Sequence, residues 1–230
     1  MTIPSPNNTL TTCRLCPRLV DWREKVAREK VKRFSDQEYW GKPVPGFGDP
    51  NARLLIVGLA PAAHGANRTG RMFTGDRSGE WLYRALHKAG FSNLPASVSR
   101  NDKLRLTDCY ITAAVRCAPP DNKPTRDEFC ACRPYLHAEV TMLKKINVVL
   151  GLGKIGFEAA VETFSVVRNI SFTKRPKFSH GATYLNNGIH FICSYHPSQQ
   201  NTFTGRLTEA MFDDVFRKAK RIVVSDRGND

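Results

Sequence analysis

The apolar residues gather in four short runs along the chain, at Leu54–Val57, Tyr110–Val115, Val148–Leu150 and Phe191–Cys193. These runs are rich in Val, Ile and Leu and do not alternate cleanly with polar residues, a pattern typical of strands covered on both faces. Stretches with helical character lie between and after them, at residues 79–89, 125–144, 155–164 and 208–223. Because strand and helix alternate, the pattern predicts a parallel sheet sandwiched by helices.

A further helix is predicted at the N-terminal side, over residues 17–34. Eight Lys or Arg residues lie between Arg14 and Arg33, and they fit a solvated charged face as well as a phosphate-binding one. The chain shows no internal repeat and no shift in composition, so we expect one domain over residues 1–230. Residues 1–11 and 226–230 are expected to be frayed.

Charge narrows the class of partner. The chain carries 35 Lys and Arg against 21 Asp and Glu, a formal net charge of +14, while its 41% hydrophobic and 24% charged fractions are those of a globular protein. No apolar run is long enough to span a bilayer, and the N-terminal residues lack the order of a signal peptide. We therefore expect a soluble, cytoplasmic protein, without contact to a membrane, that binds an anion. Nucleic acid is the commonest large anion there.

The seven cysteines indicate a metal site rather than disulfides, since their number is odd and no export signal is recognised. Cys13-x2-Cys16, Cys117 and Cys132 could together supply four thiolates, to zinc or to an iron–sulfur cluster, and the wide second pair favours the cluster. Cys109 and Cys193 lie in or beside apolar runs and are expected in the core. Cys130, two residues from Cys132, could be a substitute ligand.

The segments that follow the four predicted strands are long and polar. They read GLAPAAHGANRTGRMFTGD at 58–76, RCAPPDNKPT at 116–125, GLGKIG at 151–156 and SYHPSQQNTFTGRL at 194–207. Ligands of parallel sheets bind beyond the carboxyl ends of the strands, and long loops there usually serve function. These four loops are therefore the expected site.

Two familiar enzyme classes are disfavoured by these loops. Gly151, Gly153 and Gly156 match G-x-G-x-x-G, but no acidic residue follows at the position that would hold a ribose, and no Walker A motif is present. We therefore expect no nucleotide cofactor, with Lys154 at the following helix start free to contact a backbone phosphate. His196-Pro197-Ser198 lacks the G-x-S-x-G elbow of a serine hydrolase.

Other residues in these loops suit nucleic acid. Phe73 is an aromatic residue among Gly and Thr, near Arg68 and Arg71, which suits base stacking beside phosphate binding. His196 directly follows the fourth strand, so it should face the crevice beyond the carboxyl ends of the strands, where ligands bind. Asp76 precedes a predicted helix, so it is either an N-cap or a functional carboxylate.

Several stretches, taken together and in their order along the chain, resemble the uracil-DNA glycosylase superfamily, and specifically its type 5 (family B) iron–sulfur enzymes. The resemblance covers nearly the whole chain and rests on C-R-L-C-P-R-L at 13–19, P-V-P-G-F-G-D-P at 43–50, the first and second loops, Cys132-Arg133-Pro134, and Y-H-P-S-Q-Q-N-T-F-T-G-R-L at 195–207. It implies an α/β three-layer sandwich with a central four-stranded parallel sheet flanked by helices. It also implies a 4Fe-4S cluster on Cys13, Cys16, Cys117 and Cys132, distant from the chemistry.

The resemblance further implies roles for single residues. His196 would donate to the base carbonyl, Phe73 would stack on the flipped base, and Asn122 would contribute to catalysis and base binding, although an Asx turn is an alternative for Asn122. Other superfamily members carry an acid or amide where this chain has Leu59 and Ala60, so Asp76 is the expected substitute for handling water. The expected base-binding residues are Phe73, Ala60, His64, Asn122 and His196; the expected DNA-binding residues are Arg68, Arg71, Lys154, Gln199, Gln200 and Arg206.

The activity that follows is that of a monofunctional glycosylase, which flips a nucleotide out of double-stranded DNA and hydrolyses its N-glycosidic bond, leaving an abasic site. Related enzymes carry an Asn that reads uracil where this chain has Ala113, and fewer obligatory hydrogen bonds imply tolerance of other deaminated bases, including hypoxanthine. We expect a monomer. The alternative is a non-catalytic DNA-binding module with a structural metal or iron–sulfur site; a nucleotide or redox enzyme lacks a cofactor fingerprint.

Overall fold

A computed structural model describes residues 10–225 of the chain, and the sheet at its centre has the strand order β1-β3-β2-β4-β6-β5. The four predicted strands are its inner strands: β2 (Leu54–Gly58), β3 (Cys109–Ala113), β4 (Val148–Leu152) and β6 (Ile189–Ser194). Neighbours among them pair in parallel, with Ile56 opposite Ile111 and Leu150. The predicted parallel α/β sheet is therefore confirmed.

Two edge strands were not predicted. β1 (Phe47–Gly48) and β5 (Thr183–Asn186) pair antiparallel with β3 and β6, so the sheet has six strands rather than four. β1 is two residues long, and β5 is half exposed, so neither forms the apolar run by which a buried strand is recognised.

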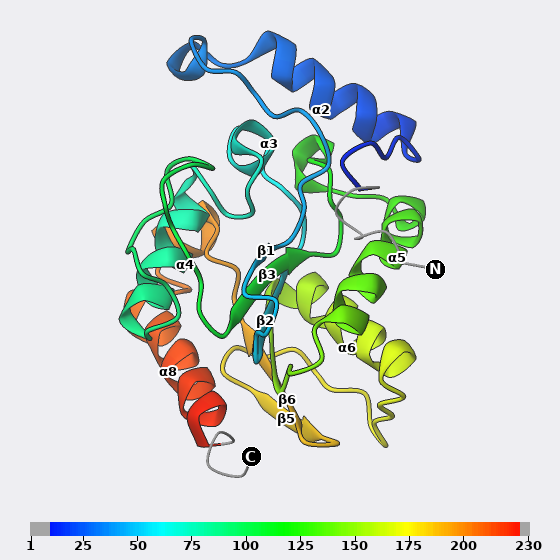
Figure 1. Cartoon of the computed structure of the whole chain (residues 1–230), viewed down its shortest axis with the longest axis vertical. Coiled ribbons are helices and arrows are strands. Elements are labelled where there is room, and N and C mark those ends of the chain that lie inside the picture. The colour runs from blue at the N-terminus through cyan, green and yellow to red at the C-terminus, as the bar shows by residue number, and fades with distance from the viewer. Residues whose placement is uncertain (1–9, 226–230) are drawn as a thin grey trace.

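Helices cover both faces of the sheet (Figure 1). α4 (Arg77–Lys88) and α8 (Glu209–Ser225) share one apolar core with Leu54 and Ile56, while α5 (Arg126–Met142) and α6 (Gly153–Val167) share the other with Leu55 and Val57. Successive residues of β2 therefore face different cores, which explains why the strand sequences do not alternate with polar residues. The three-layer arrangement is confirmed.

The N-terminal helix α2 (Pro17–Glu29) is shorter than predicted, because Lys30 takes a positive φ of 53° and ends it. A 3-10 turn, η1 (Lys32–Phe34), follows. Short helical segments lie in the strand-end loops: α3 (Ala66–Thr69), η2 (Pro120–Asn122) and α7 (Gln199–Phe203). In Figure 1, α2 lies beyond the edge of the sheet on the side of α3, so it borders the strand-end loops.

The expected frayed ends fall almost wholly on residues 1–9 and 226–230, outside the described part of the chain. Leu10, the first residue within it, is buried at 2% exposure. No helix within residues 10–225 is long and apolar enough to cross a membrane.

Candidate active site

Two aromatic rings from distant loops meet beyond the carboxyl ends of the strands. The ring centroids of Phe73, after β2, and His196, after β6, lie 5.9 Å apart with their planes tilted by 33°. A Cβ on Gly58, the last residue of β2, would lie 2.9 Å from Cζ of Phe73, so the ring rests directly on the strand backbone. The close approach therefore depends on the glycine at that strand end.

His196 is held by its own loop and is neutral at pH 7. The side chain of Asn201, in α7, donates to the carbonyl oxygen of His196 at 2.9 Å, and Ser198 caps that short helix. Burial lowers the pKa of His196 to about 4. A neutral imidazole can donate one N–H to a bound molecule without bringing a positive charge to it.

Asp76 caps helix α4. Its Oδ1 accepts from the backbone N–H of Gly79 at 2.9 Å, while Oδ2 packs so tightly on Gly65 that a Cβ there would lie 1.9 Å from it. Burial raises the pKa of Asp76, against the lowering effect of its backbone hydrogen bonds and of Arg68. The helix cap, one of the two roles predicted for Asp76, is therefore present. The capping carboxylate is poorly hydrated and lies in the same loop as Phe73.

Arg68 is buried inside the protein. Its guanidinium donates to the carbonyl oxygens of His64 and Gly75, both at 2.8 Å, and to Oε1 of Gln37 at 2.6 Å. It also lies over the Phe34 ring. With its donors used internally and 7% of its surface exposed, the structure argues against the predicted phosphate contact.

Arg71 is buried in the same way. It is 4% exposed and forms an ion pair with Asp102, with Nη2 2.7 and 2.6 Å from the two carboxylate oxygens. The predicted DNA contact is therefore not supported for Arg71 either. Its partner Asp102 lies 31 residues further along the chain, where no local pattern indicates the pair.

The remaining candidate DNA-binding residues are exposed. Lys154 stands at the start of α6 with 69% of its side chain exposed, 3.9 Å from Glu158. Gln199 and Gln200 are exposed in α7, and Arg206 lies over the ring of Tyr195 at 4.7 Å. These positions leave all four side chains accessible to a duplex.

The other candidate base-binding residues lie in different surroundings. His64 is half-buried and pairs through Nδ1 with the Tyr39 hydroxyl at 3.2 Å, and burial together with nearby Arg33 and Arg68 lowers its pKa. Asn122 is exposed in η2, where its φ of 56° fits the turn weighed as its alternative role. Ala60 packs against the cysteine cluster described next.

The four candidate ligand cysteines line one small cavity. Cys13 and Cys16 come from the segment before α2, Cys117 follows β3, and Cys132 lies in α5. Burial raises the pKa of Cys117 to about 11 and that of Cys132 to about 12, so these thiols stay neutral at pH 7 unless a cation stabilises the thiolates. Within residues 10–225, no set of three or more His, Cys, Asp or Glu side chains is arranged to hold a metal ion.

The surroundings of these sulfurs fit a thiolate-bound metal group. Nη1 of the buried Arg23 lies 2.9 Å from Sγ of Cys117, and the backbone N–H of Arg116 donates to Sγ of Cys132 at 3.2 Å. N–H groups aimed at sulfur stabilise the negative charge of a metal-bound thiolate. Cys130 is exposed and lines a different surface hollow, and Cys109 and Cys193 are buried in strands as predicted.

A buried ion pair beside this cluster is not indicated by any local sequence pattern. The guanidinium of Arg116 and the carboxylate of Glu139 form a two-fold contact with 1% and 2% of their side chains exposed. Thr112 and Tyr110 donate to the same carboxylate at 2.6 and 3.4 Å. The pair fixes the end of β3 to α5, from which Cys117 and Cys132 come.

The class that the fold and the site define is an α/β enzyme whose site lies beyond the carboxyl ends of a parallel sheet. The sequence profile of the uracil DNA glycosylase superfamily matches residues 45–220. The chain belongs to that superfamily and, within it, to the type-5 group, whose members it matches over most of its length.

The similar proteins carry matching names. A type-5 uracil-DNA glycosylase of Mycobacterium leprae is 53% identical over 96% of this chain and 95% of its own length. One of Thermus thermophilus is 53% identical over 93% and 95%. A type-4 uracil-DNA glycosylase of Thermotoga maritima is 31% identical over 78% of this chain and 82% of its own length.

Proposed function

We propose that the protein excises uracil from double-stranded DNA, and hypoxanthine and other deaminated bases as well, by hydrolysis of the N-glycosidic bond, leaving an abasic site. The observation that carries this proposal is the meeting of Phe73 and His196, 5.9 Å apart, with the poorly hydrated carboxylate of Asp76 in the same loop as Phe73. The names of the relatives that cover nearly the whole chain support uracil as a substrate.

The reaction needs a placed water and stabilisation of the departing base. As the bond breaks, the sugar gains positive charge and the base gains negative charge. The neutral His196 donates an N–H to a carbonyl oxygen of the base, where that charge collects. Leu59 and Ala60 have no polar group to hold water, so Asp76 orients the water and its negative charge favours the cationic sugar.

The target nucleotide must first leave the helix. Unstacking and unpairing cost about a few kcal/mol, least at a mispair such as uracil opposite guanine. Stacking of the flipped base on the Phe73 ring offsets part of that cost, since stacking on an aromatic side chain contributes about 1–3 kcal/mol. Base flipping is therefore part of the proposal, and Asn122 remains a candidate contact to the base or to the water.

Tolerance of more than one base follows from Ala113. This residue is 1% exposed and pairs with Gly58, the glycine at the end of β2 on which the Phe73 ring rests. A methyl group at this position neither requires a donor from the base nor rejects one, whereas a polar side chain would discriminate strongly between substrates. Hypoxanthine, which also carries a carbonyl oxygen for His196, is accepted on this basis.

We further propose a 4Fe-4S cluster on Cys13, Cys16, Cys117 and Cys132. Supporting this are the four cysteines around one cavity and the N–H donors from Arg23 and Arg116 to two of their sulfurs. When bound, the cluster supplies metal–thiolate bonds that tie the start of α2 to the β3–α5 loop and to α5. No step of base excision passes through it. The proposal also includes a single domain acting as a monomer in the cytoplasm.

The test is incubation of the purified protein with duplexes that carry a single uracil, a single hypoxanthine or no damaged base, followed by alkaline cleavage of abasic sites. We expect strand breaks at uracil and at hypoxanthine, and none in the undamaged duplex. Binding of all three duplexes without any cleavage would support the alternative, a non-catalytic DNA-binding module. Cleavage at uracil alone would remove hypoxanthine from the proposal.

A further inference from the structure

The long segment between α4 and β3 extends beside α4 to the active-site loops. It starts and ends at the antiparallel bridge between Ser92 and Leu106, where the backbone N–H of Asn93 also donates to the carbonyl of Arg105. Figure 1 shows the chain returning along α4 towards α3 before it enters β3. The tip of this segment, residues 97–104, therefore lies against the loop that follows β2.

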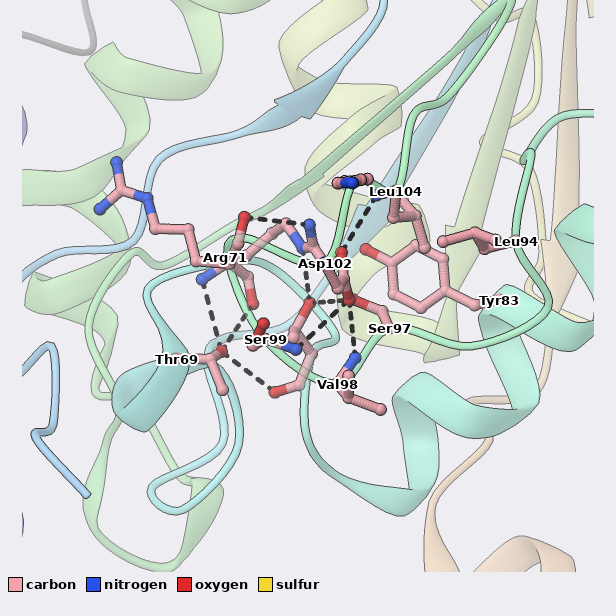
Figure 2. A network of polar contacts seen from close by, with 12 residues as sticks. Thr69, Arg71, Tyr83, Leu94, Ser97, Val98, Ser99, Asp102 and Leu104 are labelled. Carbon is pink, nitrogen blue, oxygen red and sulfur yellow. Dashed lines mark hydrogen bonds and ion pairs between the residues drawn. The ribbon is translucent and has the colours of Figure 1, made fainter. Parts of the chain in front are cut away.

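Buried polar contacts fasten the tip to that loop, as Figure 2 shows. Asp102 accepts from Arg71 with both oxygens, and 10% and 5% of the two side chains are exposed. The Ser97 hydroxyl contacts both Arg71 and the Thr74 hydroxyl, the latter at 2.6 Å. The backbone N–H of Gly75 donates to the carbonyl of Ser97 at 3.2 Å.

Asp102 also shapes the tip itself. The backbone N–H groups of Val98, Ser99 and Leu104 donate to its carboxylate at 2.9, 3.3 and 3.1 Å. Burial raises the pKa of Asp102, but the hydrogen bond from Arg71 and those from the backbone outweigh it, so its pKa lies below the ordinary value. One ionised carboxylate thus closes the turn and holds the arginine of the facing loop.

The fastened loop is the one that carries Phe73 and Asp76. Phe73 has a φ of 53°, in the left-handed region that costs an ordinary side chain free energy, so its neighbours must hold it there. On one side the Tyr83 hydroxyl donates to the carbonyl of Met72 at 2.9 Å; on the other, Arg71 and Ser97 hold Thr74. The contacts with the tip are therefore adjacent in sequence to the strained residue.

We infer that Arg71 and Asp102 are positioning residues, which lock the 97–104 tip onto the 69–76 loop and so place Phe73 and Asp76 for base excision. The inference rests on the proposed function. Neither side chain contacts the flipped base; both act through the backbone of the loop. The alternative is that this ion pair contributes only to the stability of the fold.

The protein contains a matched control for that alternative. The guanidinium of Arg84 in α4 donates to the carboxylate of Asp213 in α8 at 2.7 and 3.2 Å, with 22% and 15% of the two side chains exposed, and Lys88 donates to the same carboxylate at 2.9 Å. It joins two helices and touches neither the 69–76 loop nor the 97–104 tip. Removing this carboxylate tests loss of a buried ion pair without displacement of Phe73.

The experiment compares Asp102→Asn and Asp213→Asn with the unaltered protein. Single-turnover excision is measured on a uracil duplex at saturating protein, together with the dissociation constant for a tetrahydrofuran abasic-site duplex and the urea midpoint. We expect Asp102→Asn to lose about tenfold to a hundredfold in the single-turnover rate constant, because a displacement of the reacting groups of about 1 Å has that effect. The dissociation constant should change by less than about threefold, a split that marks lost positioning rather than lost binding.

Asp213→Asn should lower the urea midpoint about as much as Asp102→Asn does. Its single-turnover rate constant should stay within about twofold of that of the unaltered protein. Arg71→Lys, which keeps the charge but not the fork, should give an intermediate rate. If Asp102→Asn does not fold, Ser97→Ala tests the same contact with a smaller change. Unchanged excision by the folded variants, or an equal loss in Asp213→Asn, would overturn the inference. An inactive unaltered protein would instead refute the proposed function.

Discussion

Asp76 caps helix α4, and the proposed mechanism gives the same carboxylate a second role, the orientation of water. As an N-cap it accepts from Gly79 through Oδ1, and the positive end of α4 favours its ionised form. Burial against Gly65 acts in the opposite direction and raises the pKa. A carboxylate that is fixed in position and poorly hydrated is a stronger hydrogen-bond acceptor than one in water, so the cap also prepares the residue to orient a water molecule.

Substitution can separate the two roles, because Asn caps helices about as well as Asp but carries no charge. We expect Asp76→Asn to keep nearly the full urea midpoint and to lose about 10²- to 10⁴-fold in the single-turnover rate constant, the usual contribution of a group that handles a proton. Asp76→Ala should show the same loss of rate and an additional destabilisation of about 1 kcal/mol.

Glu80→Gln is the control for this pair, since Glu80 lies in the same first turn of α4 and is exposed. It should retain both stability and rate. Full single-turnover activity in Asp76→Asn would leave Asp76 with the capping role alone and would require another group to orient the water.

Single residues also show where the sequence was insufficient. Phe73 and His196 were each expected in a strand-end loop, and they meet because their loops follow β2 and β6, which only β4 separates in the sheet. Arg68 and Arg71 lie in the same polar loop, which led us to expect exposed side chains, but both are buried. Their partners Gln37 and Asp102 lie 31 residues away in opposite directions, and no local pattern announces such pairs.

At the scale of elements, the strands and helices with a clear hydrophobic pattern could be predicted from the sequence, and the segments without one could not. The four inner strands and four long helices bury apolar residues on known faces, so their positions could be predicted. The edge strands β1 and β5 and the segment 92–106 contribute few buried apolar residues, among them Leu104 and Leu106, and make many backbone and side-chain hydrogen bonds. The hydrophobic pattern does not record such hydrogen bonds, including those by which we infer that the 97–104 tip positions the site.

The cysteine cluster is the point where three elements could be joined by one metal group. Cys13 and Cys16 precede α2, Cys117 follows β3 and Cys132 lies in α5, with Arg23 from α2 reaching the sulfur of Cys117. Loss of one ligand should therefore loosen the attachment of α2 to the body of the protein. It should affect the chemistry at Phe73 and His196 only indirectly.

We expect Cys117→Ser to reduce the absorbance at about 400 nm that thiolate-to-iron charge transfer produces, and to lower the thermal midpoint. The exposed Cys130→Ser is the matched control and should keep both, because its side chain faces another hollow. Iron content and absorbance are measured on proteins purified without air. Loss of absorbance in Cys130→Ser would make Cys130 a ligand, and a protein without iron absorbance before any substitution would contradict the cluster.

At the scale of the whole molecule, the formal charge of +14 is not spread evenly over the surface. Arg71 and Arg116 are buried opposite carboxylates, and Arg23 and Arg68 are buried among carbonyl oxygens and a sulfur. These four cations stabilise loops and the cysteine cluster. DNA binding must therefore rely on exposed cations, of which Lys154 and Arg206 stand beside the strand ends.

The salt dependence of binding measures which exposed cations touch phosphate. Each contact to duplex DNA contributes about 0.9 to the slope of log K against log salt, because it releases condensed counterions. We expect Lys154→Gln and Arg206→Gln each to reduce the slope by about 0.9 for a tetrahydrofuran duplex. Arg221→Gln removes the same charge from the exposed, far end of α8 and should leave the slope unchanged. An equal reduction in all three variants would mean that the excess positive charge attracts DNA through its long-range field. Specific phosphate contacts at the strand ends would then be ruled out.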